Sequence, residues 1–214
     1  MSLPGKVRRA RIRVLFGLLA ATAGGAASAA AVSGSVADAA GAPVADAVIY
    51  AVPTGARPPS PPRPAIMDQI NKEYVPLVVP IQVGTPVSFP NKDNIRHHVY
   101  SFSPTKPFEL KLYSGTPSKP VIFEKPGAVV LGCNIHDWMV GYIYVVDTPF
   151  FAKTDKSGTA KLEGLPAGDY QVHAWHPWMK TEPAPVALKL AETAEAASFR
   201  LEIIPPRKAP RSDR

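Results

Sequence analysis

The sequence contains only one cysteine, Cys133, among its 214 residues. A single cysteine excludes an internal disulfide framework. The sequence also lacks a convincing amphipathic helix of normal length. The apolar run that starts at Val14 is broken by Gly24 and Gly25 and is too short for a comfortable membrane span.

Residues 1–29 have the pattern of a secretory signal peptide. The segment contains five basic residues, Lys6, Arg8, Arg9, Arg11 and Arg13. An apolar stretch follows, and a small-residue sequence ends at Ala29, so we expect cleavage there and a periplasmic mature protein without a transmembrane segment. An odd thiol in an oxidising compartment requires an explanation, and coordination to a metal is one because it protects a thiolate.

The charge of the mature protein is close to neutral. The full sequence has a formal net charge of +7, and removal of residues 1–29 takes away five positive charges, which leaves +2. Residues 205–214 form a basic tail that carries +3 of this charge, and we expect them to be a disordered end. This balance does not fit a nucleic-acid binder, whose basic residues form a patch on a folded face.

The distribution of turn-forming residues predicts an all-β protein. Twenty-five prolines and fifteen glycines separate short runs rich in Val, Ile, Tyr and Phe. Residues 34–48 predict a hairpin around Gly41, and the proline-rich residues 54–64 predict a linker that cannot pair inside a sheet. We expect the other strands within residues 75–91, 97–103, 119–133, 139–146, 150–177, 184–190 and 197–204.

The C-terminal strands carry a family pattern. Residues 154–158 read T-D-x-x-G and residues 165–172 read L-P-x-G-x-Y-x-V. This pattern resembles the carboxypeptidase regulatory-like domain, a small transthyretin-like β-sandwich, and residues 34–48 resemble its opening hairpin.

The two parts of this pattern lie about a hundred residues apart, which indicates an insertion. We therefore expect a first sandwich part with its linker at 30–59, an inserted β-domain at 60–148 and the second sandwich part at 149–204. The alternative is a tandem arrangement in which the N-terminal hairpin packs on the middle domain.

Four side chains of the middle region predict a metal site. Cys133, His136 and Met139 are spaced three residues apart, and His97 follows the turn that begins after the sequence F-P-N. Two imidazoles, one thiolate and a thioether are the donor set of blue copper sites. Zinc is the main competitor, but a thioether is a poor ligand for zinc and structural zinc sites use more thiolates.

Residues 75–146 resemble the cupredoxins, the plastocyanin and amicyanin family, which are Greek-key β-sandwiches. The approach to the first ligand is matched by Gly84, Val87, Phe89, Asn91 and Asp93. The loop C-x-x-H-x-x-M is the short form of amicyanins. The resemblance implies that His97, Cys133, His136 and Met139 hold one copper ion. The whole chain is similar to bacterial methylamine-utilisation proteins, which implies a link to amine oxidation.

One position departs from the cupredoxin pattern, because His98 stands where the family usually has asparagine. Adjacent strand residues point to opposite faces, so only one of His97 and His98 can face the metal. Alignment with Val99 favours His97. His98 would then take the place of the asparagine that ties the two ligand loops together.

A site filled by three strong ligands and a weak axial sulfur has no position for substrate, so we expect a carrier of single electrons, cycling between Cu(II) and Cu(I), and not an enzyme. We expect His136 and Trp138 to form the exit toward a redox partner protein, whose identity the sequence does not give. Packing of Trp138 against the next domain is an equally open alternative. Copper storage or delivery is an alternative, and a mainly structural or binding β-sandwich is another. The oligomeric state is open.

Two further segments are conspicuous. His173, His176 and Met179 suggest a second metal site, but alternation on a strand favours a sandwich core or an interdomain surface filled with aromatic side chains. Residues 106–120 mix lysines with apolar residues, which is typical of a solvated edge strand and less often of a docking site for a redox partner.

Overall fold

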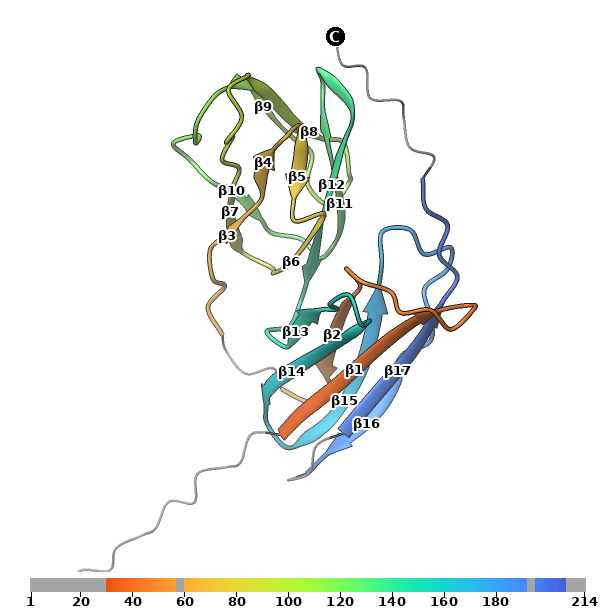
Figure 1. Cartoon of the computed structure of the whole chain (residues 1–214). Coiled ribbons are helices and arrows are strands. Elements are labelled where there is room, and N and C mark those ends of the chain that lie inside the picture. Colours follow the sequence, from red (N-terminus) through yellow and green to blue (C-terminus); the bar gives the residue numbers. More distant parts are fainter. Residues whose placement is uncertain (1–29, 57–59, 192–194, 207–214) are drawn as a thin grey trace, which may run out of the picture.

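The structure is a computed structural model that describes residues 30–56, 60–191 and 195–206 (Figure 1). Every regular element within these residues is a β-strand, which confirms the prediction of an all-β protein. The expected signal peptide and residues 207–214 of the basic tail lie outside the described residues. In the part of the chain that is described, no helix has the length and apolar character needed to cross a membrane.

Most strands lie within the predicted runs, but short strands at 65–66 and 68–70 and most of the one at 73–75 lie outside them. Residues 54–56 and 60–64 of the expected linker form no strand. The strands are β1 Ala30–Asp38, β2 Val48–Pro53, β3 Ala65–Ile66, β4 Asp68–Ile70, β5 Glu73–Val75, β6 Val78–Gln82, β7 Thr85–Ser88, β8 His97–Ser101, β9 Phe108–Tyr113, β10 Val121–Phe123, β11 Gly127–Cys133, β12 His136–Val146, β13 Phe151–Lys153, β14 Thr159–Leu165, β15 Gly168–Trp175, β16 Val186–Leu190 and β17 Glu195–Leu201.

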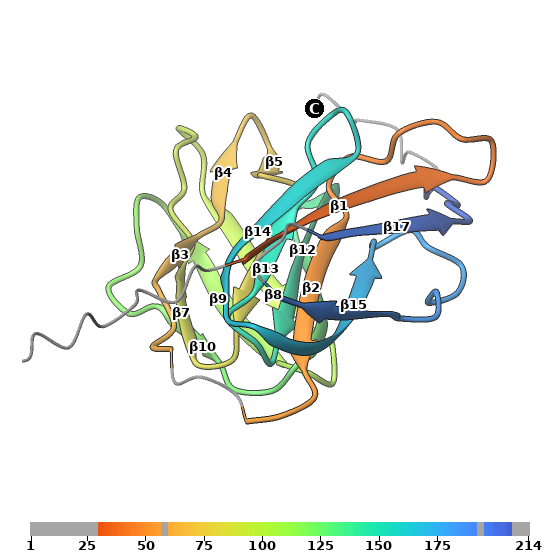
Figure 2. The same cartoon turned by 90° about the horizontal axis from the view of Figure 1, so that it is seen from below.

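The strands pair in two separate groups. β1, β2 and β13 to β17 form a three-stranded sheet (order β14-β1-β17) and a four-stranded sheet (β13-β2-β15-β16), which we name the outer unit. β3 to β12 form a five-stranded sheet (β6-β12-β11-β8-β9), a three-stranded sheet (β10-β7-β3) and the pair β4-β5, which we name the inner unit. Figure 2 looks along the molecule from below, with the outer unit in front.

The N-terminal strands do not form the predicted hairpin. A local turn does close around Gly41, because Val44 N donates to the carbonyl of Val36 at 3.0 Å. The chain then crosses the sandwich, so that β1 pairs with β14 and β17 while β2 pairs with β13 and β15. The prediction of a hairpin over residues 34–48 is therefore wrong, since each strand buries one face in a different sheet.

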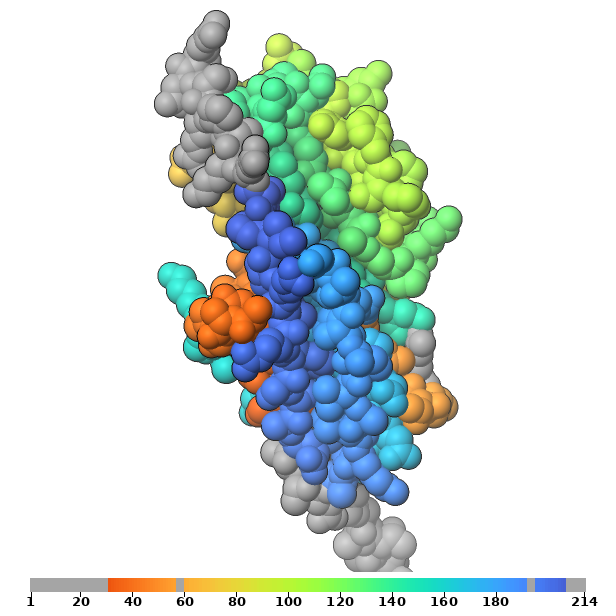
Figure 3. Space-filling view, turned by 90° about the vertical axis from the view of Figure 1, so that its right-hand side faces the viewer, coloured from red at the N-terminus to blue at the C-terminus, as the bar shows by residue number. Residues whose placement is uncertain are grey.

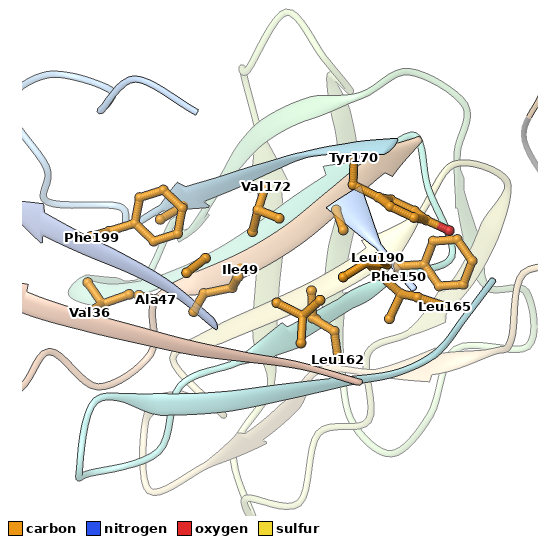
Figure 4. Packing of buried hydrophobic residues seen from close by; sticks show 14 of the residues in the cluster. Val36, Ala47, Ile49, Phe150, Leu162, Leu165, Tyr170, Val172, Leu190 and Phe199 are labelled. Carbon is orange, nitrogen blue, oxygen red and sulfur yellow. The ribbon is translucent and has the colours of Figure 1, made fainter. Parts of the chain in front are cut away.

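Each unit has a core of its own. In the outer unit, alternate residues of the facing sheets interdigitate around Ile49 and Leu162, as Figure 4 shows. The core of the inner unit contains Phe89 and Phe123 and includes two of the predicted ligands, Cys133 and Met139. The sulfur-bearing residues therefore belong to a packed interior, where side chains are held in fixed positions.

A third cluster joins the two units. The rings of Tyr144 in β12 and Trp175 in β15 stack with centroids 4.2 Å apart and an interplanar angle of 13°. Tyr50 adds a hydroxyl contact of 3.3 Å to Tyr144, and the indole N–H of Trp178 donates to the hydroxyl of Tyr142 at 3.4 Å. The two units are thus packed through aromatic side chains.

We expect the substitution Trp175→Ala to lower the free energy of unfolding by about 3–5 kcal/mol, because Trp175 is only 8% exposed and a large ring is lost from the junction. Trp175→Phe keeps a ring on Tyr144 and should lose less. Urea denaturation followed by circular dichroism measures both. An equal loss for the two variants would show that the stack does not hold the units together.

Candidate metal centre

Three of the four predicted ligands lie together in the structure. The ligating atoms of His97, Cys133 and His136 all fall within 4.8 Å of one another. The Cys133 sulfur is 3.7 Å from Nδ1 of His97 and 3.6 Å from Nδ1 of His136. The group therefore presents two nitrogens and one sulfur to a common point, which is an arrangement that can hold a metal ion.

The register of β8 and β11 places the first histidine. These strands are antiparallel, with Val99 opposite Cys133 and Tyr100 opposite Gly132. His97 and Val99 are buried while His98 and Tyr100 are half-buried, in agreement with the alternation of strand residues. His97 consequently faces the sulfur, and His98 faces the other side of the sheet.

A bulge shapes the loop between β11 and β12. Gly132 pairs with Val140, but the next pair joins Cys133 to His136, so three residues of β12 have no partner in the ladder. A bulge of this kind bends a strand and redirects its side chains. Met139 is the last of the three. It is 1% exposed and lies in the same apolar cluster as Cys133.

The three side chains are withdrawn from solvent. His97 is 0% exposed, Cys133 2% and His136 9%. Burial lowers the pKa of His136 below its ordinary value, and the neighbouring His97 and Lys72 act in the same direction. The imidazole of His136 is therefore neutral near pH 7, which leaves one ring nitrogen with a free electron pair.

A carboxylate fixes the orientation of His97. Nε2 of His97 lies 2.8 Å from Oδ2 of Asp93, and the same carboxylate accepts from the backbone N–H groups of Asn71 (2.6 Å) and Lys72 (2.9 Å). Burial alone would raise the pKa of Asp93, but these hydrogen bonds lower it below its ordinary value. An ionised Asp93 accepts a hydrogen bond from Nε2–H, so Nδ1 keeps its electron pair toward Cys133.

The turn before His97 is held by Asn91. Its side-chain N–H₂ donates to the carbonyls of Ile95 (2.7 Å) and Tyr113 (3.0 Å), and its Oδ1 accepts from the backbone N–H of Asp93 at 3.0 Å. The asparagine and the aspartate of the F-P-N-x-D sequence therefore have separate tasks. Asn91 closes the turn and Asp93 orients the imidazole.

Two tyrosines, the buried Tyr74 and the half-buried Tyr113, support the site from elsewhere in the chain. The Tyr74 hydroxyl donates to the carbonyl of Gly132 at 2.9 Å, directly before Cys133. The Tyr113 hydroxyl donates to the carbonyl of Phe89 at 2.7 Å and accepts from Gln69, and burial raises the pKa of Tyr113 to about 12. Sequence reasoning missed Tyr74 and Gln69, because no spacing links them to the ligands.

The second histidine of the pair has a different partner from the one expected. Nε2 of His98 pairs with Oε1 of Glu109 at 2.9 Å, across β8 and the edge strand β9. The expectation that His98 ties the two ligand loops together is not supported, because its side chain lies on the outer face of the sheet and contacts Glu109. The turn before His97 is closed by Asn91.

The residues of the suspected second metal site pack separately. The ring of His173 stacks on Tyr50 with centroids 4.9 Å apart, whereas His176 accepts a hydrogen bond at its Nδ1 from the backbone N–H of Trp178. Met179 packs against both the outer core and the junction. These residues fill the surface between the units, as the alternation had favoured.

Comparison with known proteins finds cupredoxins among solved structures. A copper-containing nitrite reductase (NirK) from Thermus scotoductus SA-01 is 29% identical over 45% of this chain, with a TM-score of 0.37. A purple cupredoxin from Nitrosopumilus maritimus is 27% identical over 38% of this chain and 96% of its own (TM-score 0.33), and a mutant of amicyanin in its reduced Cu(I) form is 20% identical over 38% and 80% (TM-score 0.34).

The match spans only 25% of the nitrite reductase chain. No protein-family model and no curated protein matches the sequence.

We expect Gly132→Ala to destabilise the protein by about 1–3 kcal/mol through overpacking. A Cβ at this position would lie 2.6 Å from Cζ and 2.7 Å from the hydroxyl oxygen of Tyr100. Thermal unfolding measures the loss, and the double variant with Tyr100→Ala should lose less than the sum of the single losses. If the two losses simply add, the Tyr100 ring is not what excludes a side chain here.

We expect Asp93→Asn to weaken metal binding about 10–100-fold, since it removes the carboxylate that orients His97. Competition between the protein and a chelator for Co²⁺ measures the affinity. Asp137→Asn is the matched control, because it removes an exposed carboxylate beside His136 that has no contact with His97. Equal affinities for the two variants would contradict the role of Asp93.

Proposed function

We propose that this chain is a type 1 copper protein that carries single electrons, in which His97, Cys133 and His136 hold one copper ion and Met139 supplies a fourth, weaker donor. The observation that supports it is the convergence of two Nδ1 atoms on the Cys133 sulfur in a buried site. The separations of 3.6 and 3.7 Å suit donors that share one ion at bond lengths of about 2.0–2.3 Å.

The donor set favours copper over zinc. One thiolate and two imidazoles with a nearby thioether are soft to intermediate ligands, which suit copper. Structural zinc sites are closed by four strong ligands, often several thiolates, and this chain has one cysteine. When bound, copper supplies a reversible one-electron couple.

The protein residues keep the donors still. Asp93 holds the tautomer of His97, the bulge after His136 aims Met139 inward, and the packed core surrounds Cys133. Donors that do not move between two oxidation states favour rapid electron transfer over chemistry on a bound molecule. We therefore propose a carrier and not an enzyme.

Burial of the donors also favours transfer over copper delivery. A delivery protein must release the ion to a partner, which needs ligands that the partner can reach. His97 is fully buried, and His136 is 9% exposed with the ring of Trp138 at 5.2 Å. This contact supports His136 and Trp138 as the exit for electrons, since it links the most accessible ligand to a half-buried indole.

The proposal also covers the export of the protein and the domains that surround the metal centre. We propose that residues 1–29 direct export to the periplasm and that the outer unit is a carboxypeptidase regulatory-like sandwich, in two parts at 30–59 and 149–204, with the cupredoxin domain at 60–148 between them. The separate strand pairing of the two groups supports this division. A link to methylamine utilisation would follow from the overall resemblance.

The visible spectrum of the copper-loaded protein tests the proposal. We expect a strong thiolate-to-copper absorption and a reversible one-electron couple, and we expect Cys133→Ala to abolish the absorption without unfolding the protein, because other core contacts of the inner unit remain. His98→Ala is the matched control and should retain the band. A colourless copper-loaded protein with intact circular dichroism would refute the proposed function.

A further inference from the structure

The outer face of the five-stranded sheet is only partly covered by the outer unit. On this face Ala128, Tyr142, Tyr144 and Val146 belong to the junction with the outer unit. The same face continues along β11 and β12 with Val130 (47% exposed) and Val140 (36% exposed). The apolar surface of the five-stranded sheet therefore continues beyond the part that the outer unit covers.

Strand register makes the uncovered part continuous. Val130 lies opposite Tyr142, and Gly132 lies opposite both Val140 on β12 and Tyr100 on β8. Cross-strand neighbours on one face of a sheet are in contact. We name the surface formed by Tyr100, Phe102, Val130, Gly132 and Val140 the lateral face.

Phe102 is the most exposed residue of the lateral face. Its ring is 85% exposed and lies 5.0 Å from the ring of Tyr100. The turn that carries it is tied to β11, because the hydroxyl of Ser103 accepts from Val130 N at 2.9 Å. A phenylalanine held in water forgoes about 1.5–3 kcal/mol of burial, and contiguous exposed apolar side chains mark interaction sites.

The covered half of this sheet indicates what the open half accepts. There Trp175 stacks on Tyr144, so the face takes a flat aromatic side chain. At the rim, Nε2 of His98 lies 2.9 Å from Oε1 of Glu109. A partner with an apolar surface that presents aromatic side chains fits this face better than a strongly charged one.

We infer that the lateral face is a docking surface for a redox partner protein whose contact surface is apolar and aromatic. The redox character of the partner rests on the proposed function. The Tyr100 ring packs over Gly132, the residue before Cys133, so a partner seated here lies beside the ligand loop. One electron passes, so that one protein is oxidised and the other reduced, with no transfer of atoms. In the space-filling view of Figure 3, the green part of the inner unit lies above the blue part of the outer unit.

Ferrocenemethanol, a neutral and apolar one-electron reagent, serves as the probe. It is titrated into the ¹⁵N-labelled Cu(I) protein and into the metal-free protein, and amide shifts are followed by NMR. We expect the largest shifts at the lateral face, little dependence on salt, and loss of the shifts in Phe102→Ser. Ile122→Ser is the control, because Ile122 is 49% exposed on β10 of the other sheet.

Stopped-flow reduction of the Cu(II) protein by the same reagent gives a second readout. We expect Phe102→Ser to lower the second-order rate constant about threefold or more, as for the loss of a central contact, with the absorption band unchanged. Shifts centred elsewhere, or shifts and rates that Phe102→Ser leaves unchanged, would overturn the docking surface. A missing copper band would instead refute the proposed function, while the metal-free titration would still test the face.

Discussion

The hydrogen bond between Asp93 and His97 determines what the buried site can bind. Nε2–H donates to the carboxylate, which leaves the electron pair of Nδ1 directed at the Cys133 sulfur. The bond depends in turn on the backbone N–H groups of Asn71 and Lys72, which come from the turn between β4 and β5. A small peripheral strand pair thereby becomes part of the metal centre, because an unheld carboxylate would leave the imidazole free to rotate.

Close packing explains why the ligands need no movement to meet. Cys133 and Met139 are core residues of the inner unit as well as candidate ligands, so the contacts that stabilise the sandwich also position the two sulfurs. The hydroxyl of Tyr74 holds the carbonyl of Gly132 from the other side. The stability of the inner unit and the geometry of the ligands thus depend on the same contacts. A substitution that alters these contacts is expected to change both.

Local sequence patterns were enough to predict most of the candidate site. The rest depends on contacts between segments that are distant in the sequence. The spacing of Cys133, His136 and Met139 is read along one loop, and strand alternation separates His97 from His98. The role of Asp93 and the packing of Tyr100 on Gly132 depend on turns and cross-strand register, which no spacing in the sequence encodes. The hairpin expected over residues 34–48 failed for a related reason, because the turn at Gly41 is real but the chain then crosses to the opposite sheet.

The position of β1 sets an order for the formation of the protein. Gly34 in β1 pairs with Ala160 on one side and with Ala197 on the other, so the first described strand lies between two of the last. All strands of the inner unit end by Val146, before either partner of β1 exists in a chain made from its N-terminus. The inner unit can therefore close during synthesis, whereas one edge of β1 stays open until β14 is made and the other until β17 is made.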